Sequence, residues 1–322
     1  MRAVRFDRYG DYDVLELVDA PRPEPGPGQV LVSMRAAAVN AFDDSVRRGR
    51  VAQVKAPATP GNEGSGVVVA GEGHPSGTRV MLAGPFGFGR PGTWQEYVIA
   101  APEEAIPVPG NLSDVEAAAV PVAYQAAQLA LVEGCGFAPG MSLLIPGVGG
   151  SVANAAIQLA RAQGAGRVIT SAGSTAKAEL AAQRGYGDVI DLATESLSEG
   201  VARLTDGKGV DVALDTIGGP ITGEALASVS RKGLVVVMGY AGGTRPTIDV
   251  MHLIWKPAWI VGFNGMFQPA EARAEAWSVI LRLLLEGKVK PLVDRTYPLE
   301  QAGEASRHLV EDRPFGKVIL VI

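Results

Sequence analysis

The amino-acid sequence predicts an α/β protein in which a doubly wound parallel sheet follows a β-rich, turn-rich first part. Two observations predict this class. Short apolar runs separated by Gly and Pro fill residues 1 to about 110, whereas strands and helical stretches alternate from about residue 114. A strand, a glycine-rich turn and a helix also follow one another directly between residues 142 and 163. Alternation of this kind indicates a parallel sheet that helices cover on both faces.

The first part of the chain has the pattern of a barrel-like β domain. Its strand-like runs are short, and glycine turns separate most of them. The segment 20–28 is rich in Pro and Gly and cannot be helical. A short helix with a basic last turn is expected at 40–49. The expected strands lie at 14–18, 30–36, 66–70, 78–82 and 94–99.

The second part has apolar, β-branched strands with helices between most of them. It ends with an amphipathic helix at 270–286, a helix at 299–309 and a closing strand at 317–322. The expected strands of the parallel sheet are 142–145, 167–170, 188–190, 210–215, 234–238 and 260–263, and the expected helices are 152–163, 175–184, 196–204 and 222–230.

The composition argues against nucleic acid or a membrane as a partner. The net charge is −5, and the chain has no run of Lys and Arg. The one cysteine, Cys135, can form neither an intrachain disulfide nor a cysteine-rich metal site. The N-terminus carries charges where a signal peptide has its apolar core, and Pro121 interrupts the longest mostly apolar stretch, 117–132. The sequence therefore predicts a soluble, cytoplasmic protein that acts on a small molecule.

The glycine turn after the first strand of the parallel sheet is the central motif. Its spacing is Gly-x-Gly-Gly-x-x-Ala, and a helix follows at once. Backbone N–H groups at a helix N-terminus can hold a pyrophosphate, and glycine allows the phosphate to approach the backbone. The alternative is a plain strand-to-helix turn. The expected cofactor contacts are Gly147, Val148, Gly149, Gly150, Ser151 and Val152.

The ends of three further strands support a dinucleotide site. No Asp or Glu occurs from 167 to 178, where an NAD-binding fold places an acidic residue for the ribose hydroxyl. Hydroxyls and Lys177 occur there instead, which favours the 2′-phosphate of NADPH, although Lys177 could equally be a solvated lysine at a helix start. Small or polar residues also follow the later strands. The expected contacts are Ser171, Ala172, Gly173 and Lys177, then Thr216, Ile217, Gly239 and Tyr240.

An ordered set of motifs resembles one superfamily over essentially all 322 residues. The chain resembles the medium-chain dehydrogenases/reductases, and within them the zinc-independent quinone oxidoreductase branch, which is zeta-crystallin-like. The resemblance implies a Rossmann domain at 121–264 inserted in a GroES-like catalytic domain at 1–120, with 265–322 returning to that domain. It also implies cofactor contacts at Phe263, Asn264 and Lys317. The motifs lie at 39–43, 60–68, 92–98, 147–153, 172–177, 211–215 and 316–320.

Zinc-binding members similar to this chain have Cys where Asn40 stands and His where Asn62 stands, and they add a loop with four cysteines. This chain has neither ligand and lacks the loop, so no metal is expected. Glu63 remains alone and is expected to be structural, bonded to nearby backbone or to an arginine. The three histidines lie far apart without ligand spacing: His74, His252 and His308.

The resemblance places Asn40 and Asp43 beside the nicotinamide and the substrate. The Asn40 amide could donate to the acceptor carbonyl or to the nicotinamide amide, or it could cap a helix. Asp43 could instead be a first-turn carboxylate with no chemical role. The phenol of Tyr124 is a candidate proton donor, with a buried packing role as the alternative. Asn40, Asp43 and Tyr124 are therefore the candidate catalytic residues.

Without a metal, hydride transfer from NADPH suits an acceptor that delocalises the charge itself. We therefore expect reduction of a quinone or of an α,β-unsaturated carbonyl. The alternatives are an enoyl-thioester reductase and a non-catalytic NADPH-binding sensor or structural protein. The resemblance also implies a homodimer through the apolar last strand of the sheet, 259–263, unless the 270–286 helix covers that edge.

Overall fold

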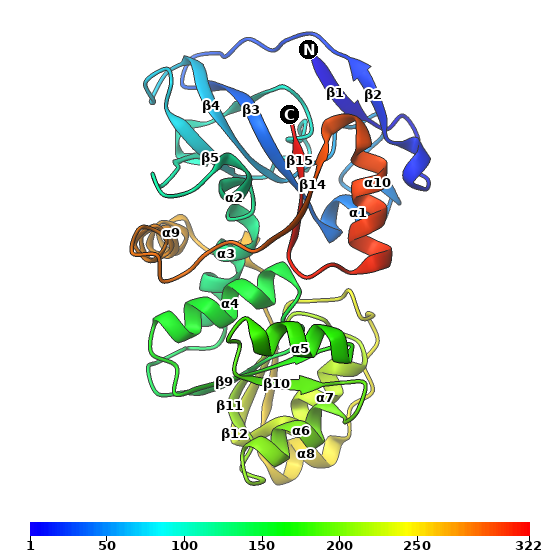
Figure 1. The fold of residues 1–322 in the computed structure, drawn as a ribbon, viewed down its shortest axis with the longest axis vertical. Helices are drawn as coiled ribbons and strands as arrows, with labels where there is room; N and C mark the ends of the chain where they lie inside the picture. Colours follow the sequence, from blue (N-terminus) through cyan, green and yellow to red (C-terminus); the bar gives the residue numbers. More distant parts are fainter. The chain divides into compact units, whose positions relative to one another are not determined.

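A computed structural model describes residues 1–322 and confirms the predicted α/β class (Figure 1). The chain divides into two compact units. Unit 1 comprises Met1–Val122 and Pro291–Ile322, and unit 2 comprises Ala123–Lys290. The sequence predicted a return to the first domain from residue 265, whereas the chain re-enters unit 1 at Pro291. The difference arises because helix α9 (Ala270–Leu285), one side of which is buried, belongs to unit 2.

Unit 2 is built on a six-stranded sheet in which all neighbouring strands are parallel. Its order is β10 (Asp188–Asp191), β9 (Arg167–Ala172), β8 (Ser142–Ile145), β11 (Val210–Asp215), β12 (Val229–Val237) and β13 (Trp259–Gly262). From β8 the chain adds β9 and β10 on one side of the sheet and then returns to add β11, β12 and β13 on the other side. The direction in which strands are added therefore reverses between β8 and β11. Ligands of open parallel sheets bind at the carboxyl ends of the strands, at such a reversal.

Helices of unit 2 pack against this sheet as the alternating sequence pattern predicted (Figure 1). The strands form a core because their apolar residues are fully buried, among them Leu144, Ile169 and Val235. The short helix α8 was not expected from the sequence. The helices are α3 (Pro121–Leu129), which continues as a π-helical turn at Ala130–Gly134, then α4 (Ser151–Ala162), α5 (Thr175–Gln183), α6 (Leu197–Leu204), α7 (Pro220–Ser228), α8 (Val250–Trp255) and α9.

Unit 1 contains a mainly antiparallel seven-stranded sheet and a separate two-stranded ribbon. The sheet follows the order β14-β15-β3-β4-β5-β7, and β6 also pairs with β3. The strands are β1 (Arg2–Arg5) and β2 (Glu16–Asp19) in the ribbon, and β3 (Val30–Val39), β4 (Glu63–Gly71), β5 (Arg79–Ala83), β6 (Tyr97–Ala100), β7 (Ala105–Pro107), β14 (Val293–Pro298) and β15 (Lys317–Val321) in the sheet.

The C-terminal strand β15 lies beside β3 in antiparallel register, with Val318 opposite Val39. This pairing brings Lys317 next to the point where β3 ends and α1 (Ala41–Arg47) begins. The other helices of unit 1 are α2 (Asp114–Ala118) and α10 (Ala302–Arg307). The helix expected at 299–309 is divided, because a 3₁₀ turn precedes α10 and a π-helical turn follows it. The largely exposed strand β14 has no apolar alternation and was not expected.

Candidate active site

The glycine turn connects β8 to α4 and is held by backbone hydrogen bonds to the neighbouring strand. The N–H of Val148 donates to the carbonyl oxygen of Ser171 at 2.9 Å, and the N–H of Gly150 donates to Gly147 O at 2.8 Å. Gly147 has φ +82°, and a Cβ there would meet Ile217 Cδ1 at 2.9 Å. The first N–H groups of α4 have no partner within the helix. Glycine backbone and free helical N–H groups together fit the pyrophosphate of a dinucleotide.

The end of β9 leads into α5, whose N-cap Ser174 accepts a hydrogen bond from the backbone N–H of Lys177 at 3.4 Å. Gly173 has open space where a Cβ would stand. The carboxylate of Asp191, at the end of β10, accepts a hydrogen bond from Thr175 Oγ1 at 2.7 Å. The start of α5 therefore has an acidic neighbour that comes from the next strand, and sequence reasoning did not find it.

The loop after β11 is organised by Asp215, which is fully buried. Its carboxylate accepts from the N–H groups of Ile217 at 2.9 Å and Gly218 at 2.8 Å, and from Thr222 Oγ1 at 2.6 Å. Gly239 packs directly on this loop, since a Cβ there would lie 1.9 Å from the carbonyl oxygen of Thr216. The sequence marked the small residues of both loops but not the carboxylate that shapes the first one.

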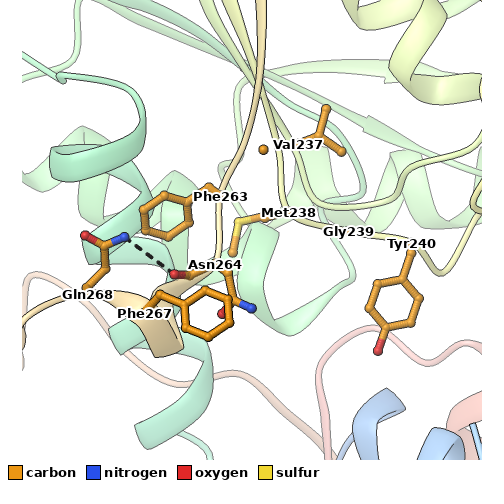
Figure 2. A pocket seen from close by; sticks show the side chains of 9 residues that line it. Val237, Met238, Gly239, Tyr240, Phe263, Asn264, Phe267 and Gln268 are labelled. Atoms are coloured by element: carbon orange, nitrogen blue, oxygen red, sulfur yellow. Dashed lines mark hydrogen bonds between the residues drawn. The ribbon is translucent and has the colours of Figure 1, made fainter. Parts of the chain in front are cut away.

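A cavity of about 550 Å³ lies in unit 2, where β12 and β13 end (Figure 2). It brings together four of the predicted cofactor contacts, Gly239, Tyr240, Phe263 and Asn264. Figure 2 shows the rings of Phe263 and Phe267 close to Asn264 and Gln268 in this cavity. Apolar rings, amides and exposed backbone in one concave site are typical of a pocket for a small organic ligand.

In unit 1, the end of β3 and the loop before β4 meet at Asp43, which is buried at 3% exposure. Its carboxylate accepts from the backbone N–H of Asn40 at 2.8 Å and from that of Gly61 at 2.9 Å. Burial, with a smaller contribution from Glu63, raises the pKa of Asp43 to about 7, although the two N–H donors and the charge of Lys317 oppose the shift. Asp43 therefore fixes the start of α1 and holds the loop that carries Asn62.

Glu63 is fully buried and satisfied on both carboxylate oxygens. Its Oε2 accepts from the backbone N–H of Val122 at 2.7 Å, while Oε1 accepts from Asn40 Nδ2 at 2.9 Å and from the ammonium of Lys317. Lys317 is itself buried, and its ammonium also donates to Asn40 Oδ1. Asn40 Nδ2 donates to Asn62 Oδ1 at 2.7 Å as well. The structural role expected for Glu63 is present, with a lysine instead of the expected arginine.

The candidate catalytic residues fall into two groups. Asn40 and Asp43 lie together in unit 1, in one hydrogen-bonded network with Lys317. Lys317 was expected to contact the cofactor, and the structure places its ammonium against Asn40 and Glu63. Tyr124 lies in unit 2, buried, where its hydroxyl accepts from Gln158 Nε2 at 3.3 Å. Burial strongly raises the pKa of the Tyr124 phenol.

Two segments match known families. Residues 26–110 match the family described as alcohol dehydrogenase GroES-like domain, and residues 151–282 match the family described as zinc-binding dehydrogenase. The synaptic vesicle membrane protein VAT-1 homolog of Rattus norvegicus is 32% identical over 346 residues, covering 100% of this chain and 84% of that protein. The quinone oxidoreductase-like protein 2 of Rattus norvegicus is 31% identical over 309 residues, covering 94% and 87%.

Solved structures are similar along the whole chain. One, described as an NAD-dependent alcohol dehydrogenase, is 34% identical with a TM-score of 0.91, and the match covers 100% of both chains. A mycobacterial protein described as complexed with NADPH is 25% identical with a TM-score of 0.87, again over 100% of both chains.

The fold and the glycine turn thus define an oxidoreductase scaffold with a GroES-like domain and a dinucleotide-binding sheet. This chain belongs to the medium-chain dehydrogenase/reductase superfamily, as its motifs predicted, and its relatives include proteins named for quinone reduction. No helix has both the length and the apolar character that crossing a bilayer requires. No group of three or more His, Cys, Asp or Glu side chains is arranged to hold a metal ion.

Proposed function

We propose that this protein is a zinc-independent reductase that uses NADPH to reduce a quinone or an α,β-unsaturated carbonyl. The observation that carries the proposal is the donor set in unit 1. Where similar zinc enzymes have thiolate and imidazole ligands, this chain presents the amides of Asn40 and Asn62, which are poor zinc ligands. The carboxylate of Glu63, which follows Asn62 in the chain, already accepts from Lys317, Asn40 and Val122.

The family description that mentions zinc does not bear on these positions. It matches residues 151–282, which include neither Asn40 nor Asn62. A lysine ammonium that donates to both Asn40 and Glu63 also gives this network its own positive charge. The ammonium of Lys317 therefore balances the buried charge of Glu63.

The chemistry follows from the acceptor. When bound, NADPH supplies a hydride. The acceptor would gain a C–H bond at its β-carbon from that hydride, leaving NADP⁺, and the electron pair of its double bond would move to the carbonyl oxygen. One proton from solvent or a side chain completes the reduction to a saturated carbonyl, or to a hydroquinone after hydride and proton uptake by a quinone. The protein must orient the acceptor, stabilise the negative oxygen and exclude water.

The cofactor is expected at the glycine turn and at the ends of β9, β11 and β12. The residues that would hold its pyrophosphate are those of the turn at 147–152, and those near its adenosine ribose are Ser171, Gly173 and Lys177. The absence of an acidic residue at the end of β9 supports NADPH. The mycobacterial relative described with NADPH also supports it.

Steady-state turnover assays test the proposal. Oxidation of NADPH is followed by the loss of reduced-nicotinamide absorbance with 1,4-benzoquinone, with a small α,β-unsaturated ketone and with a crotonyl thioester. We expect turnover with the quinone or the ketone. Activity confined to the thioester would establish the enoyl-thioester reductase instead. Tight NADPH binding by calorimetry without turnover on any acceptor would establish the non-catalytic alternative.

A homodimer through β13 is part of the same proposal. The strand pairs with β12 on one side and forms the last strand of the sheet. Trp259 is 60% exposed and Val261 is 39% exposed, so helix α9 does not cover these side chains. Pairing β13 with its copy would bury apolar surface and remove a free edge. Sedimentation velocity on the wild type and on Trp259→Lys checks this, with a shift to monomer expected for the variant.

A further inference from the structure

The orientation of the Asn40 amide is fixed by Lys317. A lysine ammonium can only donate hydrogen bonds, so the atom of Asn40 that faces it must be the carbonyl oxygen Oδ1. The amide nitrogen Nδ2 then faces Glu63 Oε1 and Asn62 Oδ1, at 2.9 Å and 2.7 Å. Both hydrogens on Nδ2 are used by these two acceptors. The donation from Asn40 to an acceptor carbonyl that the sequence suggested therefore has no free hydrogen in this arrangement.

The orientation of Asn62 follows in turn. Because Asn40 Nδ2 is a donor, the atom of Asn62 that it contacts must be Oδ1. The two N–H groups on Asn62 Nδ2 are therefore directed away from Asn40, and no protein group accepts a hydrogen bond from them. Asn62 is half-buried at the bend before β4, and the hydrogen bond from Asn40 holds its amide oxygen.

We propose that the Asn62 amide nitrogen donates a hydrogen bond to the acceptor carbonyl oxygen and stabilises its negative charge during hydride addition. This inference rests on the proposed reductase function and names the donor that the reaction requires. Asn40 and Lys317 are positioning residues in this scheme, since they act on the acceptor only through Asn62. The sequence offered no signal for this assignment, because it depends on which hydrogens the network leaves free.

The network also strengthens the donor. The ammonium of Lys317 donates to the Asn40 oxygen, and the Asn40 nitrogen donates to the Asn62 oxygen. In such a chain each hydrogen bond polarises the next, and in a buried setting the polarisation is weakly screened. The positive charge of Lys317 therefore acts through two amides on the terminal N–H groups of Asn62. A preorganised donor of this kind needs no rearrangement when the oxyanion forms.

The test compares Asn62→Asp and Asn62→Ala with the wild type. Asn62→Asp keeps the oxygen that Asn40 contacts and removes both N–H donors, so the hydrogen bond from Asn40 is preserved. Loss of one oxyanion donor costs about 10²-fold in rate, and we expect kcat/KM for the quinone or enone to fall by about that factor in both variants. The NADPH dissociation constant should change less than about twofold, since the cofactor residues are untouched. Gln301→Ala, which removes an exposed amide of the same unit, is the matched control.

A binding measurement separates this inference from the proposed function. The probe is 4-nitrophenolate, whose absorption changes when its oxygen accepts a hydrogen bond. The wild type should bind it about tenfold more tightly than either variant. If the wild type turns over no quinone or enone, the proposed function fails. The phenolate affinities then still show whether Asn62 donates a hydrogen bond to a bound oxyanion. Equal phenolate affinity in wild type and variants, or variants with kcat/KM within about twofold of the wild type, would overturn the role of Asn62.

Discussion

The two units hold their candidate functional residues in different ways. In unit 2 the candidate residues are held mainly by backbone contacts, in the glycine turn after β8 and where Gly239 packs on the loop after β11. In unit 1 they are held by side-chain hydrogen bonds among Lys317, Glu63 and Asn40. Backbone N–H groups suit a phosphate because they are always donors, whereas a side-chain network can adapt to different chemistry with a few substitutions.

The two units also differ in which of their residues resemble those of zinc-binding dehydrogenases. The positions that carry zinc ligands in similar enzymes carry amides here, and the charge within the network comes from Lys317. The dinucleotide turn keeps its glycine spacing at the same time. In the proposed function, unit 2 would hold the cofactor through its glycine turn, and the network of unit 1 would supply groups for the acceptor.

The largest effect is expected from Lys317→Met, which tests whether the network of unit 1 depends on its cation. The substitution leaves the fully buried carboxylate of Glu63 without its charged partner. Removing one member of a buried ion pair costs about 3–5 kcal/mol. Urea unfolding followed by circular dichroism should show a loss of this size.

Two variants sharpen the Lys317 result. Lys288→Met breaks an ion pair with Glu286 in which both side chains are more than a third exposed, and it should change the free energy of unfolding by less than about 0.5 kcal/mol. Combining Lys317→Met with Glu63→Gln removes the buried negative charge as well and should recover part of the loss. A Lys317→Met protein as stable as Lys288→Met would show that unit 1 does not depend on this cation.

The difference between the units also explains what the sequence could predict. The glycine turn depends on neighbours in sequence, so its strand, turn and helix were all predicted and are present. The resemblance placed Asn40 and Asp43 in the same part of the site, and both lie in one short motif. Lys317 contacts Asn40 across 277 residues, and only the pairing of β15 with β3 brings them together.

Other features depended on tertiary structure in the same way. The return to unit 1 at Pro291 instead of 265 depends on where α9 buries its apolar side chains, which an amphipathic pattern does not specify. Asp215 was recognised only as the end of a strand, and its role in the following loop depends on hydrogen bonds to Gly218 and Thr222. The direction of the amides in unit 1 follows from the whole network and from no single motif.

The second prediction tests the backbone of unit 2. In Gly239→Ala the new methyl group would lie 1.9 Å from the carbonyl oxygen of Thr216, so one of the two loops must move. Overpacking of this kind costs about 1–3 kcal/mol. We expect a lower Tm together with weaker NADPH binding in calorimetry. Gly110→Ala is the control, since nothing lies within 4 Å of the added methyl group. Equal behaviour of the two variants would argue against a tight packing requirement at Gly239.

The third prediction concerns pH and the buried carboxyl group of unit 1. Burial raises the pKa of Asp43 to about 7 in the folded chain, from 3.8 for an ordinary carboxyl group. Between these values the folded chain binds a proton that the unfolded chain has lost. The contribution of Asp43 to the free energy of unfolding therefore falls as pH rises, by up to about 1.4 kcal/mol per pH unit.

Asp43→Asn cannot titrate and lacks this dependence. The new amide has only one oxygen, so it can accept a hydrogen bond from only one of the two backbone N–H groups that donate to Asp43. We therefore expect the variant to be less stable than the wild type. The stability gap between wild type and variant should narrow as pH rises from 5 to 8, measured as the difference in Tm (these limits bracket the folded pKa of about 7). A gap that stays constant or widens would show that Asp43 is ionised throughout this range.

The smallest effect is expected from Lys177→Ala, which asks whether one side chain matters in the unit that relies on backbone. If Lys177 contacts the 2′-phosphate, its loss should weaken NADPH binding about tenfold and leave NADH binding nearly unchanged. Calorimetry with both cofactors measures this, and Lys208→Ala, an exposed lysine of the same unit, is the control. The carboxylate of Asp191 also lies at the start of α5, where it accepts a hydrogen bond from Thr175 Oγ1. Equal losses for NADPH and NADH would mean that groups other than Lys177 determine the choice of cofactor.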